Sequence, residues 1–284
     1  MHRPSGLLGA FVELIYLDMR TTPTAREWLL PRGTTDLLVA LGDRSGSARV
    51  AGGACWEPGS VLISGRWMRP FLLEPATRSS TLGVVFRLGG AAALLGIAPS
   101  ATRDAHVPLT EFWGPCALDF GARVLAAGDP ARQLAAVERL LIARLADARS
   151  RPPSLLAAAR RLSTDRQERV AQVSASLGMS LRRMEQVFAS GVGVTPKRYQ
   201  RLQRFRRALT HLEWGREVGF ASYALELGYY DQAHFNNEFR SHAGMSPSRY
   251  LAARRPHRNH VEADSTTVSL SSKLPRGPDA TLPP

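Results

Sequence analysis

The chain of 284 residues contains little cysteine and no long hydrophobic run. Its two cysteines, Cys55 and Cys116, are too few for a disulfide framework, and neither has partners at the spacing of a zinc site. We expect both to be small buried hydrophobic residues in a reducing compartment. An apolar run such as residues 91–98 is far shorter than the ~20 residues that span a bilayer, and the first residues lack the apolar region of a signal peptide. The sequence therefore favours a cytoplasmic protein with no membrane partner.

Short motifs that many enzymes use are missing as well. Gly89-Gly90 is not followed by the Gly-Lys-Ser/Thr of a phosphate-binding loop, and the sequence has neither Gly-x-Ser-x-Gly nor His-Glu-x-x-His. These absences predict that the chain is not an enzyme, and that it has no catalytic residues, no cofactor and no metal site.

Lysine is scarce, with only Lys197 and Lys273 among 37 basic residues, and the charge is unevenly distributed. The formal net charge is +13 for the chain, but it is +3 over residues 1–150 and +11 over residues 151–260. The remaining C-terminal residues carry −1. A positive charge concentrated in one segment suggests a polyanionic partner, either nucleic acid or an acidic membrane surface.

The first part of the chain is rich in predicted strands. Residues 35–41, 60–64 and 80–86 are short apolar runs between turns that contain Gly, Pro, Asp and Ser, which is typical of a small barrel or sandwich. Its aromatic residues allow either a ligand pocket or a plain hydrophobic core, and the core is favoured. They are Trp28, Trp56, Trp67, Phe71 and Phe86.

From about Leu118 the pattern becomes helical, with apolar residues spaced three and four apart on one predicted face. These are Leu134, Val137, Leu141 and Leu145. Arg151-Pro152-Pro153 interrupts the helix because proline cannot continue it, so we place a domain boundary between residues 150 and 151. Residues 259–284 are rich in Ser, Thr and Pro and contain no aromatic residue, which predicts a disordered tail.

The basic segment contains an internal repeat. Leu177-Gly178 recurs 50 residues later as Leu227-Gly228. The pairs that recur at 51 residues are Phe188 and Phe239, Gly193 and Gly244, Thr195-Pro196 and Ser246-Pro247, and Tyr199 and Tyr250. Each unit is predicted to be a helix, a tight glycine-containing turn and a second helix, followed by a third helix that begins at proline. The expected N-caps are Ser180, Asp231, Thr195 and Ser246.

A helix, a tight turn and a second helix form a helix-turn-helix, whose second helix enters the DNA major groove. In the first copy, Met184 and Phe188 are expected to face the core, as are Phe235 and Phe239 in the second. The polar side chains of both second helices are either base-reading groups or ordinary solvated positions, and their joint occurrence in two copies favours DNA contact. The predicted DNA-contacting residues are Ser180, Arg182, Arg183, Glu185 and Gln186, then Gln232, His234, Asn236, Asn237 and Arg240.

Between the two units, the segment from Pro196 to Leu209 has helical spacing and many arginines. Its 14 residues would span ~21 Å as a helix. Together with the flanking helices, it could hold two recognition helices roughly 34 Å apart, which is one turn of DNA. Arg198 and Arg201 are expected to contact phosphates, which gives affinity without sequence information.

The residues of the second unit carry a resemblance to a known family. Leu227-Gly228-Tyr229-Tyr230-Asp231-Gln232-Ala233-His234-Phe235, with Gly244-Met245-Ser246-Pro247 and Tyr250, resembles the signature of AraC-type transcriptional regulators. Residues 31–37, 89–96 and 107–114 resemble an uncharacterised N-terminal domain found on bacterial regulators of this type. The resemblance implies a cupin-like N-terminal barrel that senses a small molecule or mediates dimerisation.

Together these observations predict an α+β protein. A β-rich, barrel-like N-terminal domain (residues 1–150) is expected to precede an all-α DNA-binding domain (residues 151–258) with two helix-turn-helix units joined by a linker helix. The predicted function is sequence-specific transcription regulation on double-stranded DNA. A small-molecule effector, a second copy of the chain and RNA polymerase are candidate further partners.

Two alternatives remain open from the sequence. The first is a DNA-repair methyltransferase fused to an AraC-type domain, against which the missing Pro-Cys-His-Arg sequence counts, since Cys116 follows Pro115 in a different setting. The second is a basic architectural or membrane-surface protein that binds without reading sequence, which two capped, two-sided helices disfavour.

Overall fold

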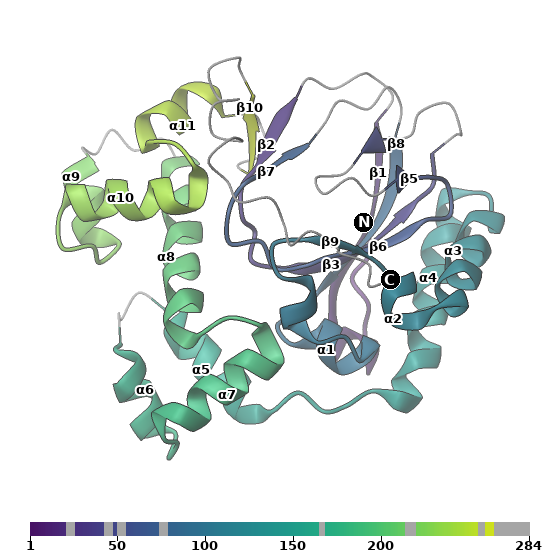
Figure 1. The fold of residues 1–284 in the computed structure, drawn as a ribbon, viewed down its shortest axis with the longest axis horizontal. Helices are drawn as coiled ribbons and strands as arrows, with labels where there is room; N and C mark the ends of the chain where they lie inside the picture. The colour runs from purple at the N-terminus through teal and green to yellow at the C-terminus, as the bar shows by residue number, and fades with distance from the viewer. Residues whose placement is uncertain are drawn as a thin grey trace, which may run out of the picture.

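The computed structural model places a β-rich part beside a helical part (Figure 1). The residues that the structure describes are 1–20, 26–42, 48–49, 55–73, 79–164, 168–213, 220–254 and 259–263. The strands are β1 (Val12–Arg20), β2 (Glu27–Leu29), β3 (Thr35–Ala40), β4 (Ala48–Arg49), β5 (Cys55–Trp56), β6 (Val61–Ser64), β7 (Phe71–Leu73), β8 (Ser79–Phe86), β9 (His106–Pro108) and β10 (His260–Glu262). The three strands predicted from the sequence correspond to β3, β6 and β8.

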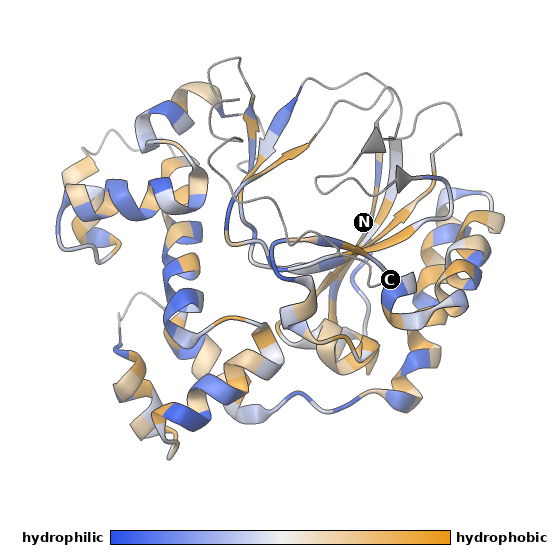
Figure 2. Cartoon of the chain, in the orientation of Figure 1, coloured by the Kyte–Doolittle hydropathy of each residue, from blue (hydrophilic) through white to orange (hydrophobic). Residues whose placement is uncertain are grey.

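The main sheet has five antiparallel strands in the order β1-β8-β3-β6-β9. The N-terminal helices are α1 (Gly90–Leu95), α2 (Thr110–Trp113), α3 (Pro115–Ala126) and α4 (Pro130–Ala143), with short 3-10 turns η1 (Leu8–Ala10), η2 (Pro99–Thr102) and η3 (Arg144–Asp147). Helix α3 contacts β3 and β6, and α4 contacts β1, so both helices cover the sheet (Figure 1). Figure 2 shows that the central strands are largely hydrophobic, as expected for a sheet buried under helices.

The α+β fold class is confirmed, whereas the barrel-like closure expected from the strand pattern is wrong. The described strands form three separate sheets, of five, three and two strands. A barrel requires the two edge strands of a sheet to pair, but the edge strands β1 and β9 lie at opposite ends of the main sheet, and β9 has only three residues. Helices, instead of further strands, supply the cover that buries the sheet face.

The helical part follows a proline-containing connection, as the Arg151-Pro152-Pro153 sequence predicted. Its helices are α5 (Pro153–Leu162), α6 (Val170–Ser176), α7 (Leu181–Val192), α8 (Pro196–Glu213), α9 (Phe220–Glu226), α10 (Gln232–Ala243) and α11 (Pro247–Ala253). The long α8 stands between the group of α5, α6 and α7 and the group of α9, α10 and α11 (Figure 1). None of the helices in the described ranges has the length and apolarity needed to span a membrane.

One hydrophobic core lies wholly in the N-terminal part, and a second core joins the two parts. The second core contains the buried apolar residues of α5 to α11, and it also includes Trp28, Leu30 and Met68 from the β-rich part. Trp28 lies on β2, which pairs with β7 on one side and with β10 on the other. The N-terminal part thus supplies a wall of the core that supports the helix-turn-helix units.

Strand β10 corrects the prediction of a disordered tail from residue 259. His260, Val261 and Glu262 pair with Leu29, Trp28 and Glu27, and Val261 is completely buried. A three-residue strand stabilised by a partner more than 200 residues away has no local signal that separates it from a polar tail. The rest of the predicted tail, residues 264–284, lies outside the described residues.

The structure also shows whether several of the aromatic residues and cysteines considered above are buried or exposed. Trp28 and Phe86 are core residues, as favoured from the sequence, and Phe71 packs with Trp67 and His106 at ring-centroid distances of 4.3 and 5.0 Å. Cys116 was expected to be buried but is exposed at the start of α3. The side chains of Cys55 and Trp56 lie outside the described residues.

Candidate nucleic-acid interface

The two repeat units have the same backbone geometry at their glycines. Gly178 and Gly228 in the turns have φ of 64° and 77°, in the left-handed region that favours glycine. Gly193 and Gly244, which end α7 and α10, have φ of 79° and 72°. A glycine in this conformation stops a helix and redirects the chain. The repeat read from the sequence is therefore a repeat of structure.

The predicted helix caps are present in both units. The Ser180 hydroxyl accepts from the Arg183 N–H at 3.1 Å, and the Asp231 carboxylate accepts from the His234 N–H at 2.7 Å. Thr195 and Ser246 cap α8 and α11 in the same way, with distances of 3.3 Å each. Each cap satisfies an otherwise unpaired N–H group and fixes where its helix begins.

The first turn contains an additional bond that the second lacks. Ser174 is 1% exposed, and its hydroxyl donates to the Met179 carbonyl at 2.6 Å. The Met179 N–H in turn donates to the Ser174 carbonyl, just as the Tyr229 N–H donates to the Ala224 carbonyl in the second unit. A buried hydroxyl is tolerated at a position that is alanine in the second unit because the turn itself provides its acceptor.

The expected core faces of the recognition helices are confirmed. Met184 and Phe188 on α7 and Phe235 and Phe239 on α10 are completely buried. With its apolar stripe turned inward, each helix presents its polar residues outward. The exposed predicted DNA contacts are Ser180, Arg182, Arg183, Glu185, Gln186, Arg198, Gln232, His234, Asn237 and Arg240, and Asn236 is partly exposed.

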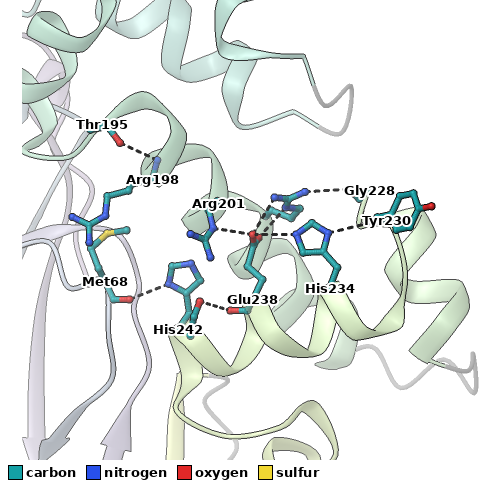
Figure 3. A network of polar contacts seen from close by, with 11 residues as sticks. Met68, Thr195, Arg198, Arg201, Gly228, Tyr230, His234, Glu238 and His242 are labelled. Atoms are coloured by element: carbon teal, nitrogen blue, oxygen red, sulfur yellow. Dashed lines mark hydrogen bonds and ion pairs between the residues drawn. The ribbon is translucent and has the colours of Figure 1, made fainter. Parts of the chain in front are cut away.

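A buried carboxylate joins α10 to the linker helix α8. Glu238 is 3% exposed, and one of its oxygens accepts from Arg201 Nε at 2.9 Å (Figure 3). Its other oxygen accepts from Arg204 Nε at 3.0 Å. Arg204 also donates to the Gly228 carbonyl at 3.0 Å, and its guanidinium lies 4.6 Å from the centre of the Tyr229 ring. Two charge-assisted bonds and a contact with the turn thus fix the second helix-turn-helix on α8.

This network gives Arg201 a structural contact beside the predicted phosphate contact. Its side chain pairs with Glu238 and is partly exposed, and the phosphate contact stays a prediction. His234 is also engaged locally, because its Nδ1 accepts from the Tyr230 N–H at 3.3 Å and its Nε2 lies 3.9 Å from a Glu238 oxygen (Figure 3). Arg198, one turn before Arg201, remains an exposed cation on the same helix.

His242, at the end of α10, connects the second unit to the β-rich part. It is 6% exposed, and its Nδ1 donates to the Met68 carbonyl at 2.9 Å (Figure 3). Burial lowers the pKa of His242. The His242 ring packs against Phe205 of α8 with centroids 5.1 Å apart, so it belongs to the core that joins the two parts.

The first unit contacts the β-rich part through the end of α7. Helix α7 packs against η2 and α1, and Arg103 donates to the Gly193 carbonyl at 3.3 Å. A Cβ atom at Gly193 would lie 2.8 Å from the Pro99 carbonyl carbon. Sequence reasoning missed these contacts, together with Glu238 and Arg204, since each joins residues more than 30 positions apart. A charged residue between Phe235 and Phe239, on the buried stripe, was the one available signal for Glu238.

Comparisons with known proteins agree with this geometry. Residues 173–253 match the family model described as "Helix-turn-helix domain", which covers both units. Residues 1–108 match the model described as "Domain of unknown function (DUF6597)", in agreement with the predicted uncharacterised N-terminal domain. No curated protein matches the chain by sequence.

Solved structures with a similar arrangement include two of ToxT from Vibrio cholerae. The strain O395 structure is 11% identical with a TM-score of 0.45, covering 86% of this chain and 97% of that one. A fatty-acid-bound structure from strain SCE256 is 11% identical with a TM-score of 0.44, covering 84% and 94%. The AraC-like activator CuxR is 15% identical with a TM-score of 0.20, covering 72% and 78%.

The family match and the two capped, glycine-terminated units identify the C-terminal part on their own. The chain thus contains a helix-turn-helix domain over residues 173–253, a kind of domain that binds DNA, and a domain of unknown function over residues 1–108.

Proposed function

We propose that the protein reads a specific DNA sequence by placing α7 and α10 in successive major grooves on one face of the duplex. The observation that carries this proposal is the equivalence of the two units, which have the same caps, the same glycine geometry and an exposed polar face on each second helix. Arginine, glutamine and asparagine on these faces can form paired hydrogen bonds with guanine or adenine edges. The 18 residues of α8, about 27 Å of helix, suit a separation of one DNA turn.

A binding-site selection with the full-length protein tests this proposal. We expect a preferred site with two half-sites whose centres lie about 10 base pairs apart, bound at least 1,000-fold more tightly than random duplex. Affinity for the selected site should fall steeply with salt, since many contacts are to phosphates. Binding of random duplexes within a few-fold of the best selected site would overturn the proposal.

A substitution on α10 separates base reading from general affinity. Asn237 is exposed on the recognition face, and Asn237→Ala should relax the preference at one base pair of one half-site, at a cost of about 1–3 kcal/mol. An equal loss of affinity on every sequence would instead assign Asn237 to the DNA backbone. The N-terminal part is proposed to act as a sensor or dimerisation module and not as an enzyme, in a cytoplasmic regulator that works on promoters.

A further inference from the structure

A cavity lies between the β-rich part and the linker helix α8. It has a volume of about 280 Å³, near the lower end of the range of small-molecule pockets. One side is lined by residues of α8, namely Gln203, Arg206, Arg207 and Thr210. The lining also includes Arg32, from the N-terminal part, and Asn259, just before β10. The wall therefore combines groups from both functional parts of the protein.

The lining is strongly basic and polar. Three arginines face the cavity, and no carboxylate among the described residues lines it. Arg32 pairs with Asp36, Arg206 donates to the Gln203 amide oxygen at 3.1 Å, and Arg207 donates to the Ser163 carbonyl at 2.6 Å. These contacts hold the guanidinium groups in position around one space, and planar guanidinium groups match carboxylate and phosphate oxygens.

A fourth arginine adds to the positive field. Arg66 is 4% exposed, and its Nε and Nη1 have no hydrogen-bond partner among the described residues. Burial and the nearby charge of Arg206 lower the pKa of Arg66 to about 10. A Cβ atom at Gly33 would lie 3.5 Å from both Arg66 Nη1 and Arg206 Cδ, so these two arginines flank the same glycine. Positive charge at this density favours an anion in the adjoining cavity.

We propose that the cavity binds a small hydrophilic organic anion, with a carboxylate or phosphate held by Arg32, Arg206 and Arg207. The amides of Gln203 and Asn259 and the hydroxyl of Thr34 suit hydroxyl or carbonyl groups on the same ligand. Val85 and Leu209 are the apolar lining residues, so the walls offer little surface to a long acyl chain. The chemical class that fits is a sugar acid, a sugar phosphate or a short dicarboxylic acid.

The position of the cavity gives this ligand a regulatory role, which rests on the proposed function. Helix α8 carries one recognition unit at each end, so an anion that ties its middle to the β-rich part restricts how the two units can move relative to each other. Anion binding and DNA binding are therefore coupled, so that each changes the affinity of the protein for the other by the same factor. Ligand binding itself does not depend on the DNA-binding role.

Thermal unfolding of the full chain tests the site. The probes are inorganic phosphate and 6-phosphogluconate, each at several millimolar, against sodium chloride of equal ionic strength. We expect both to raise the Tm of the wild type, 6-phosphogluconate by about 3 °C or more. Arg206→Gln and Thr34→Asp, which remove a cation from the lining and add a carboxylate to it, should each lose at least half of that shift. The matched controls are Arg123→Gln, at an exposed position on α3, and Thr110→Asp on α2, which should keep the full shift.

The outcomes are decisive in both directions. Equal shifts in all five proteins, or no shift of the wild type with either probe, would overturn the site, and a shift with phosphate that the two cavity variants retain would identify adventitious ion binding only. On a selected DNA site, 6-phosphogluconate should change the Kd of the wild type by about fivefold and that of Arg206→Gln by much less. If no preferred DNA site exists but the thermal shifts follow the cavity variants, the proposed function fails while the anion site stands.

Discussion

The Arg201 Nε donates to the Glu238 Oε2 at 2.9 Å, and this bond binds the second recognition helix to the linker helix. The carboxylate is buried, and Arg204 approaches it with two further N–H groups at 3.0 and 3.1 Å. Several bonds that converge on one carboxylate restrict both the distance and the rotation of α10 relative to α8. The orientation of the second unit on DNA is therefore set from its inner side.

The first prediction concerns this carboxylate. Glu238→Gln leaves Arg201 and Arg204 without their buried counter-charge, and breaking such a pair should lower the free energy of unfolding by about 3 kcal/mol. Urea denaturation of the full-length protein measures the change. Glu185→Gln on the exposed face of α7 is the matched control, with an expected change below about 0.5 kcal/mol. Equal stability of the two variants would show that Glu238 is not the anchor of α10.

A second prediction separates two arginines that the sequence treated alike. Arg198 is exposed on α8, so Arg198→Ala should weaken binding to all DNA sequences and reduce the slope of log K against log salt by about one, with little change in Tm. Arg201→Ala should instead lower the Tm, because it removes a partner of Glu238. Fluorescence anisotropy at four salt concentrations, together with thermal unfolding, measures both effects. A reversed pattern would return Arg201 to the phosphate-contacting role.

The sequence predicts the features of the two units that depend on nearby residues. The caps at Ser180 and Asp231 and the turn glycines Gly178 and Gly228 were predicted correctly because their physical causes are local, within three or four residues. The buried stripes of α7 and α10 were predicted because hydrophobic spacing reports a helix face directly.

The contacts that the sequence did not predict join residues far apart in the chain. Arg201 and Arg204 reach Glu238 across 37 and 34 positions, and His242 reaches Met68 across 174. No local pattern distinguishes such an arginine from one that faces phosphate. Strand β10 was not predicted for the same reason, because it pairs with β2, which lies more than 200 residues earlier in the chain.

A third prediction concerns stability in mild acid. Burial lowers the pKa of His106 to about 4, and neither ring nitrogen has a hydrogen-bond partner among the described residues. Because this folded-state pKa lies below the ordinary value of 6.5, the unfolded chain binds the proton first as the pH falls. The contribution of neutral His106 to the free energy of unfolding is therefore fully present above about pH 6.5. It is lost as the pH falls from 6.5 to 4, and the total loss is about 3 kcal/mol.

His106→Phe should remove this dependence, since a phenyl ring retains the packing with Trp67 and Phe71 and does not titrate. Urea denaturation at pH 7.5, 5.5 and 4.5 should give a flatter stability profile for the variant than for the wild type. His211→Phe, at a partly exposed position on α8, is the matched control and should leave the wild-type slope in place. If His106→Phe keeps the full slope, other groups cause the acid sensitivity.

The last prediction compares two glycines with the same backbone geometry and different surroundings. Gly178 and Gly193 both have positive φ, of 64° and 79°, so alanine at either position costs about 1 kcal/mol in backbone strain. At Gly178 nothing lies within 4 Å of an added Cβ, whereas at Gly193 the carbonyl of Pro99 lies within 2.9 Å. Gly193→Ala must therefore also displace η2 from the end of α7, for a total of about 3 kcal/mol. Hydrogen exchange at the ends of α7 and η2 should increase in Gly193→Ala and stay unchanged in Gly178→Ala. If the two variants lose equal stability, α7 does not depend on its contact with the N-terminal part, and a signal from that part would have to reach the first recognition helix by another route.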